Sequence, residues 1–358
     1  MKQYRIGIIG ATGMVGQRFI LLLQNHPWFH IQLLAASASS AGKKYSEAVG
    51  NRWAFDCPIP QDVASMTVMD AEADKEKIAE QVDFVFCAVN MKKDEIRAME
   101  ESYARLEVPV VSNNSACRGL EDVPMIIPEL NASHMEVIPT QRRRLGTKRG
   151  FIAVKPNCSI QSYVPALTPL RDFGLEKVSV CTYQAISGAG KTFRTWPEMV
   201  DNVIPYIGGE DEKSENEPLK IWGHVENGVI VNAEKPIISA QCLRVAASDG
   251  HMAAVSVSFS KKPSREEILA RWANFETEAQ RLCLPNAPKP FLQYFEDPSR
   301  PQTRLDRDFQ GGYGVSIGRL REDKLFDYRF VCLSHNTVRG AAGGGILTAE
   351  LLCANGWI

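Results

Sequence analysis

The chain has 358 residues, more than the roughly 250–300 at which a single hydrophobic core stops growing, so its length predicts two domains. Its net charge of −1 argues against nucleic-acid binding, and no apolar run approaches the roughly 20 residues of a membrane span. Nine cysteines without a Cys-x-x-Cys pair argue against a disulfide framework and a zinc site, so we expect reduced thiols and no metal.

The N-terminal half alternates short apolar runs with helical stretches. The chain enters an apolar strand at residues 6–9 directly, without the pattern of a signal peptide, so we expect a cytoplasmic protein. Residues 14–24 then carry apolar side chains at helical spacing. Further strands are predicted at 32–36, 84–88 and 108–111, and charged helices at 75–81 and 93–107. This alternation is typical of an α/β domain of the Rossmann type, with a parallel, doubly wound sheet.

A glycine loop lies between the first strand and the first helix. It reads Gly10-Ala11-Thr12-Gly13-Met14-Val15-Gly16, a Gly-x-x-Gly-x-x-Gly variant of the usual dinucleotide fingerprint. Glycines there let backbone N–H groups approach a pyrophosphate, and the helix dipole favours its charge. The alternative is that these glycines only permit a tight turn and close helix packing.

The end of the second strand indicates which dinucleotide is bound. NAD enzymes usually place an acidic residue there to hold the ribose hydroxyls. This chain instead has hydroxyl and ammonium groups without a nearby carboxylate, namely Ser37, Ser39, Ser40 and Lys43. These groups suit a 2′-phosphate, so NADP is the expected cofactor; a polar turn that touches nothing is the alternative.

Cys158 is the candidate nucleophile. It follows an apolar strand at 151–154 and precedes a predicted helix that contains Tyr163, Val164 and Leu167. A cysteine at a helix N-terminus has its thiolate stabilised by the dipole and by free N–H groups. Most cysteines, however, are simply small buried hydrophobic residues.

The second half of the chain changes character after Val154. Residues 177–184 and 241–259 alternate polar and apolar side chains, as in a mainly antiparallel sheet with one covered face. Ser248-Asp249-Gly250-His251 predicts a two-residue hairpin turn. In that hairpin His251, the candidate base, and Arg244 share a face about 13 Å apart along the strand, where they could hold opposite ends of one small substrate.

The last stretch, 340–353, opens with glycines and alanines and continues as an apolar helix that we expect to pack on the first domain. The predicted division is therefore a nucleotide-binding domain of residues 1–157, completed by 336–358, and an α+β catalytic and dimerisation domain of residues 158–335.

With these residues in place, the chain resembles the aspartate-semialdehyde dehydrogenases over nearly its whole length, closest to their archaeal and fungal branch. The resemblance rests on the glycine loop and on motifs that recur in order: 112–118, 128–131, 156–159, Gln184 with 187–190, Arg244, His251 and 336–343. The sequence departs from the pattern at Lys155, where many relatives have a small polar residue, and in the basic run 142–149, which we interpret as a solvated loop.

The resemblance implies a role for each site residue. Cys158 is the nucleophile, His251 the acid and base, and Gln184 orients the acyl group. Arg244 binds the substrate carboxylate, while Glu210 of a Glu-x-x-Lys motif faces its ammonium; residues 217–220 have the same spacing, which leaves that motif ambiguous. The remaining substrate and cofactor contacts expected are Lys213 and Arg118 for phosphate, the Cys158 backbone N–H assisted by Asn157 for the oxyanion, and Ser187, Gly188 and Asn336 for NADP.

The implied reaction is reduction of L-aspartyl 4-phosphate by NADPH to L-aspartate 4-semialdehyde and phosphate, through a thioacyl enzyme. It leads to lysine, methionine, threonine, isoleucine and diaminopimelate. The implied assembly is a homodimer or homotetramer. Two alternatives remain open: an enzyme with another acyl group, such as a malonyl- or succinyl-CoA reductase or N-acetylglutamyl-phosphate reductase, and a non-catalytic NADP sensor on the same domains.

Overall fold

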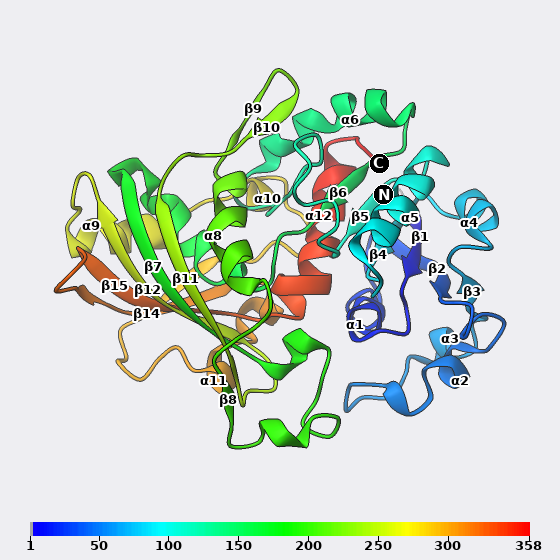
Figure 1. Cartoon of the computed structure of the whole chain (residues 1–358), viewed down its shortest axis with the longest axis horizontal. Coiled ribbons are helices and arrows are strands. Elements are labelled where there is room, and N and C mark those ends of the chain that lie inside the picture. The colour runs from blue at the N-terminus through cyan, green and yellow to red at the C-terminus, as the bar shows by residue number, and fades with distance from the viewer. Residues whose placement is uncertain (1–2) are drawn as a thin grey trace.

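The computed structural model describes residues 3–358, which form two large sheets, one from each half of the chain, and one small two-stranded sheet (Figure 1). The N-terminal half alternates strands and helices as predicted. Its strands are β1 Tyr4–Ile9, β2 Phe29–Ala36, β3 Met69–Asp70, β4 Phe84–Cys87, β5 Val110–Ser112 and β6 Ile152–Val154. Its α-helices are α1 Met14–Leu22, α2 Tyr45–Val49, α3 Gln61–Ala64, α4 Lys75–Gln81, α5 Lys93–Arg105 and α6 Ile138–Leu145. The 3₁₀ helices η1 Gly50–Arg52 and η2 Ala132–Val137 complete it.

The first sheet is parallel throughout, in the order β3-β2-β1-β4-β5-β6. Every residue of β4, β5 and β6 is buried, as expected for strands covered on both faces. The chain reverses direction across the sheet between β1 and β4. Ligands of doubly wound sheets bind at the carboxyl ends of the strands beside such a reversal, which is where β1 leads into the glycine loop.

The C-terminal half forms a mixed seven-stranded sheet in the order β13-β14-β15-β12-β7-β11-β8, with a separate hairpin of β9 and β10. Four of its six neighbouring pairs are antiparallel, which confirms the predicted character. Its strands are β7 Leu175–Gln184, β8 Val203–Ile204, β9 His224–Glu226, β10 Val229–Val231, β11 Ile237–Val245, β12 His251–Phe259, β13 Leu292–Phe295, β14 Val315–Glu322 and β15 Tyr328–Ser334. Its helices are η3 Ser159–Gln161, α7 Val164–Leu167, η4 Thr168–Phe173, η5 Ile186–Ala189, η6 Pro197–Met199, α8 Glu210–Ile221, α9 Arg265–Ala273, α10 Glu278–Arg281, α11 Thr303–Asp306 and η7 Phe309–Gly312.

The predicted hairpin at 248–251 is wrong. β11 and β12 are not neighbours, because β7 lies between them, parallel to β11 and antiparallel to β12. His251 is paired with Ser334 of β15 instead of Ser248. The Asp-Gly turn therefore reverses the chain over the end of β7, and Arg244 and His251 lie on strands that are separated by β7.

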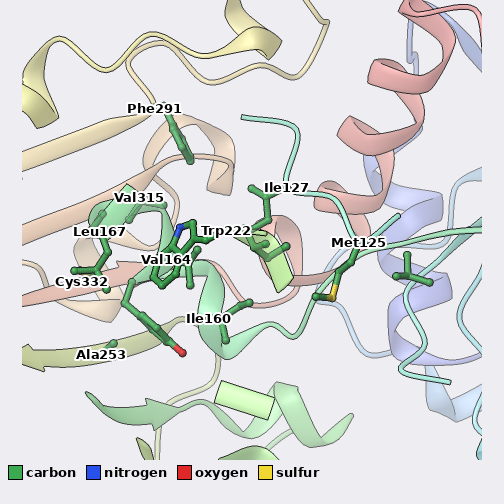
Figure 2. Close-up of a cluster of buried hydrophobic side chains, with 14 of the residues drawn as sticks. Met125, Ile127, Ile160, Val164, Leu167, Trp222, Ala253, Phe291, Val315 and Cys332 are labelled. Atoms are coloured by element: carbon green, nitrogen blue, oxygen red, sulfur yellow. The ribbon is translucent and has the colours of Figure 1, made fainter. Parts of the chain in front are cut away.

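The C-terminal segment returns to the first half, as predicted. A π-helical turn, η8 Val338–Ala342, leads into α12 Gly343–Ala354, which packs against α1 and β5. Figure 1 shows α12 in the middle of the molecule, between the two sheets, with both chain ends on the same side. Buried side chains continue across this junction: Met125 and Ile127 lie in one cluster with Ile160, Val164 and Trp222 (Figure 2).

Only the second half of the basic run 142–149 is the solvated loop that the sequence suggests, with Lys148 and Arg149 exposed. Arg142, Arg143 and Arg144 form the last turn of α6, which Gly146 ends in a left-handed conformation with a φ of 73°. Arg144 pairs with Asp122 and with Glu101. These arginines therefore stabilise α6, because cations at the C-terminus of a helix complement the helix dipole and the free carbonyl groups of the last turn.

Candidate active site

Two of the loop glycines are required by packing. Gly10 has a φ of +87°, and a Cβ placed on it would lie 2.3 Å from the Ala88 carbonyl oxygen. A Cβ on Gly16 would lie 2.3 Å from the Gly10 oxygen. Gly13 is different, since its φ is −78° and its nearest neighbour would be 3.5 Å away. It caps α1 without a side-chain hydrogen bond, which leaves the helix N–H groups open to an anion.

A cavity of about 730 Å³ opens beside this loop. Gly10, Thr12, Gly13 and Ser37 line it, as the sequence predicts for a dinucleotide site. Ala11 and Gly16 are buried behind the loop, and Met14 and Val15 are half-buried in α1. The cavity has the size and the backbone donors of a ligand site at the carboxyl edge of a parallel sheet.

The other residues proposed for the 2′-phosphate do not line the cavity. The Lys43 ammonium donates a hydrogen bond to the Ser39 carbonyl oxygen at 2.8 Å, and Ser40 is buried. Arg52 lines the cavity instead and was missed, because η1 carries no recognisable motif. The expectation of no nearby carboxylate is also wrong, since β3 brings Asp70 and the following Glu72 to the cavity wall.

Cys158 and His251 form a pair in which the cysteine is half-buried and the histidine is buried: 3.5 Å separates Cys158 Sγ from His251 Nε2. Cys158 precedes the single 3₁₀ turn η3, while His251 is the first residue of β12. The longer helix predicted after Cys158 is broken into three short pieces, so dipole stabilisation of the thiolate is weaker than expected. Burial, followed by the nearby Glu210, raises the pKa of the Cys158 thiol, which is therefore protonated at neutral pH.

The tautomer of His251 is fixed by the backbone. The Ala185 N–H donates to Nδ1 at 3.1 Å, so the hydrogen of the neutral ring is on Nε2, facing Cys158. Burial, and then the Arg244 guanidinium, lower the pKa of His251 well below its ordinary value. The imidazole is consequently a neutral hydrogen-bond donor toward the sulfur.

Three predicted site residues converge on Glu210, the first residue of α8. Asn157 Nδ2 donates to both of its carboxylate oxygens, at 3.0 and 3.1 Å, and Gln184 Nε2 donates at 3.3 Å. Lys213 lies one turn along α8 and pairs with Glu210 at 2.8 Å. Glu210 is only 8% exposed, so a buried negative charge lies beside the nucleophile.

The two Glu-x-x-Lys motifs have different surroundings. Lys220 donates to the carbonyl oxygens of Arg118, Leu120 and Val123, so all three N–H donors of its ammonium are bound to the backbone. Glu217 pairs with Arg118 at 3.0 Å and accepts from the Asn157 backbone N–H at 2.5 Å. Lys213, which pairs with Glu210, and Arg118 line a cavity of about 620 Å³, and Glu217 and Lys220 line the same cavity. The two motifs therefore differ in the partners of their lysines.

Arg244 and His251 approach one point from opposite sides of β7. Arg244 Nη1 donates to the Ala185 oxygen at 2.7 Å. A Cβ on Gly188 would lie 2.8 Å from Arg244 Nη1 and 3.0 Å from His251 Nε2. Gly188 therefore keeps open the space between guanidinium and imidazole, where the sequence predicted 13 Å of separation.

Asn336 joins the segments around this space. Its Oδ1 accepts from the Gly250 N–H at 2.8 Å, and its Nδ2 donates to Ser187 Oγ at 2.8 Å. Gly340 closes the other side, because a Cβ there would lie 2.9 Å from Cys158 Cβ. Sequence reasoning singled out Ser187, Gly188 and Asn336 as cofactor contacts; the structure brings them to the cysteine–histidine pair.

Known proteins resemble this chain over nearly its whole length. A family model described as semialdehyde dehydrogenase, NAD binding domain, matches residues 5–138, and one described as semialdehyde dehydrogenase, dimerisation domain, matches residues 167–339. These matches define the broad class, the semialdehyde dehydrogenases.

Individual relatives narrow the class. An aspartate-semialdehyde dehydrogenase of Aspergillus fumigatus is 41% identical over 363 residues, covering 99% of this chain and 98% of the relative. One from Archaeoglobus fulgidus is 42% identical over 350 residues, covering 98% of each. The crystal structure of the Candida albicans aspartate-semialdehyde dehydrogenase with NADP superimposes with a TM-score of 0.89 at 39% identity, covering 100% of both chains. The chain belongs to the aspartate-semialdehyde dehydrogenase family.

Within residues 3–358, no helix is long and apolar enough to cross a membrane, and no group of three or more His, Cys, Asp or Glu side chains is arranged to hold a metal ion.

Proposed function

We propose that this protein catalyses the NADPH-dependent reductive dephosphorylation of L-aspartyl 4-phosphate to L-aspartate 4-semialdehyde. One observation carries the proposal: the Cys158–His251 pair lies close to both a carboxylate, Glu210, and a guanidinium, Arg244, as a small amino-acid substrate requires. A non-catalytic sensor of NADP would have no use for this pair.

The glycine loop and its cavity fit NADP. Gly13 leaves the N-terminus of α1 open for the pyrophosphate, while Ser37 and Arg52 supply a hydroxyl and a cation for a 2′-phosphate. The related Candida albicans enzyme was solved with NADP. When bound, the cofactor supplies the hydride. Ser187, Gly188 and Asn336 lie beside the reacting sulfur, and we assign them to its nicotinamide end.

The reaction begins at Cys158. Its thiolate attacks the acyl carbon, the bond to phosphate breaks, and a thioester forms. We assign the oxyanion to the Cys158 backbone N–H, because the Asn157 side chain is held by Glu210. His251 shares its Nε2 hydrogen with the oxyanion through a hydrogen bond as charge develops, and it takes the same hydrogen back in full when the tetrahedral adduct of the reduction step releases the aldehyde and the Cys158 thiolate.

Charged residues orient the substrate around the sulfur. Arg244 binds the α-carboxylate through a bidentate pair, and Glu210 binds the α-ammonium. Lys213 and Arg118 bind the phosphate from their shared cavity, while Gln184 orients the acyl group from the end of β7.

The test is phosphate-dependent oxidation of L-aspartate 4-semialdehyde with NADP, compared across acyl substrates. We expect the aspartyl compound to have the highest kcat/KM and to require phosphate. Faster turnover with coenzyme A as acyl acceptor, or with an N-acetylated glutamyl compound, would replace the substrate assignment. Cofactor binding without turnover of any substrate would identify a sensor.

Ser37→Asp should shift cofactor preference from NADP toward NAD. A carboxylate at the end of β2 repels the 2′-phosphate and accepts hydrogen bonds from ribose hydroxyls. The measurement is the ratio of kcat/KM for the two cofactors. Ser65→Asp is the matched control, since Ser65 is exposed and does not line the cavity. An unchanged ratio in Ser37→Asp would assign the 2′-phosphate to Arg52 alone.

Glu210→Gln should discriminate between substrates with and without an amino group. The substitution preserves size and removes a charge-assisted hydrogen bond worth about 1.5–3 kcal/mol, so kcat/KM for L-aspartate 4-semialdehyde should fall roughly 10- to 150-fold. Oxidation of succinate semialdehyde, which lacks the amino group, is the internal control and should change little. Equal losses for both compounds would show that Glu210 acts on the enzyme and not on the ammonium.

We further infer a homodimer or homotetramer in the cytoplasm, with the domain limits given by the sequence. The match of residues 167–339 to a dimerisation domain supports self-association. All nine cysteines are free within the described residues, which suits a reducing compartment. Sedimentation equilibrium across protein concentrations distinguishes the two assemblies.

A further inference from the structure

Lys155 is a buried basic residue three positions before Cys158, and it has no role in the proposed reaction. Its side chain is 2% exposed, and its ammonium donates to the Pro156 carbonyl oxygen. Glu217, the carboxylate that acts on it, is already paired with Arg118. Within residues 3–358, Lys155 forms no ion pair with a carboxylate. An unpaired buried ammonium is costly, which points to a functional use.

Lys155 and Cys158 pack against the same C-terminal segment. A Cβ on Gly344 would lie 3.0 Å from Lys155 Cδ, and a Cβ on Gly340 would lie 2.9 Å from Cys158 Cβ. The two glycines are four residues apart, so one stretch of backbone covers both side chains. Lys155 and Cys158 are therefore confined side by side under the same segment.

His251 is poorly suited to balance a thiolate charge. Its Nδ1 accepts from the Ala185 N–H, and a protonated ring would turn that hydrogen bond into two opposed N–H groups. The positively charged Arg244 guanidinium, which approaches the imidazole beside Gly188, also disfavours protonation of His251. The usual pair of thiolate and imidazolium is therefore disfavoured here, and another cation must accompany the thiolate.

The charged groups near the Cys158 sulfur indicate which cation accompanies the thiolate. Glu210 opposes ionisation of the thiol and raises its pKa in the same direction as burial. Three cations act against that rise: Lys155 has the largest effect, followed by Arg118 and Arg244. The two arginines are always protonated, so among these three only Lys155 is able to exchange a proton.

The surroundings of Lys155 suit that exchange. Burial, and then the charge of Arg118, lower the pKa of Lys155 to about 7, with a smaller contribution from Arg339. A thiolate at Cys158 and the carboxylate of Glu217 act in the opposite direction. The ammonium form thus depends on whether the neighbouring sulfur is charged, as expected for two coupled groups.

We propose that Lys155 takes the proton that Cys158 releases, so that the lysine is an ammonium whenever the sulfur is a thiolate. The S–H bond breaks with its electron pair left on sulfur, and an N–H bond forms on the lone pair of Nζ. The total charge of the pair does not change, so the buried site gains no uncompensated charge. Lys155 is a positioning residue for the nucleophile's charge; the inference rests on Cys158 being the nucleophile of the proposed function.

The test measures thiol ionisation without any substrate. Iodoacetamide is reacted with the full-length protein at pH 8, and labelling of Cys158 is quantified by peptide mass spectrometry. In Lys155→Met the rate should fall about ten-fold, equivalent to one pKa unit of lost stabilisation. The control Lys148→Met removes an exposed lysine and should leave the rate unchanged. Methionine is similar in volume, so the variant should keep its Tm within a few degrees.

The outcomes separate the two proposals. An unreactive Cys158 in the unmodified protein would refute the nucleophile and with it the proposed function. A reactive Cys158 with the same rate in Lys155→Met would refute the role of Lys155 alone. If Lys155→Met does not fold, ¹³C NMR titration of the lysine in Cys158→Ser decides. Loss of the thiol should let Lys155 deprotonate at lower pH than in the unmodified protein, and an unchanged titration would refute the inference.

Discussion

Cys158→Ser should abolish turnover while NADP binding is retained. At neutral pH a serine hydroxyl is a far weaker nucleophile than a thiol and ionises at much higher pH, so kcat should fall roughly 10³-fold or more. The cofactor cavity is built from other segments and does not include Cys158. Steady-state kinetics and NADP titration by fluorescence measure the two properties.

The matched control is Cys242→Ser, since Cys242 is a buried thiol of β11 that contacts Ser214 and no reacting group. This variant should retain most of its activity. Retention of more than a few per cent of kcat in Cys158→Ser would place the covalent chemistry elsewhere.

His251→Gln should lower kcat/KM by roughly 10²–10⁴-fold, the range attributed to a positioned proton donor and acceptor. Glutamine keeps a hydrogen-bonding amide but does not transfer a proton. Because burial and Arg244 hold the pKa of His251 well below 6.5, the neutral ring persists through neutral pH and is lost only as pH falls further. The unmodified enzyme should therefore lose activity on the acid side only below pH 6.5.

That acid limb is the diagnostic measurement. It should disappear from the pH–rate profile of His251→Gln, whereas a profile of unchanged shape would assign the proton transfer to another group. His134→Gln is a useful comparison, since His134 is also buried but bonds to Asn131, away from the sulfur.

Local sequence patterns predicted the helices and strands, but they did not predict which strands pair with one another. The strand at 4–9 and the helix at 14–22 follow from period and glycine position, and the parallel sheet follows from their repetition. The Asp249-Gly250 turn was a sound local signal for a chain reversal. It could not reveal that β7, more than 60 residues earlier in the chain, lies between the two strands, because strand order is decided by long-range pairing.

The site shows the same division between local and long-range information. Cys158 and the glycine loop were predictable because each lies beside a strand end. Arg52 and Asp70 were not, since only the packed fold brings them to the cofactor cavity. Glu210 and Glu217 are two turns apart on one helix in motifs of equal spacing, and only the partners of Lys220 distinguish them. Burial also reversed the expected effect on the thiol of Cys158.

The position of η8 and α12 constrains when this protein becomes active during its synthesis. Residues 338–354 are translated after every other part of the site, yet Gly340 forms the wall against Cys158 and α12 packs on the first sheet. N-terminal domains generally fold as they emerge from the ribosome. Here an N-terminal half folded in that way would still lack a wall of its nucleophile site, so a nascent or prematurely terminated chain should carry an incomplete, inactive site.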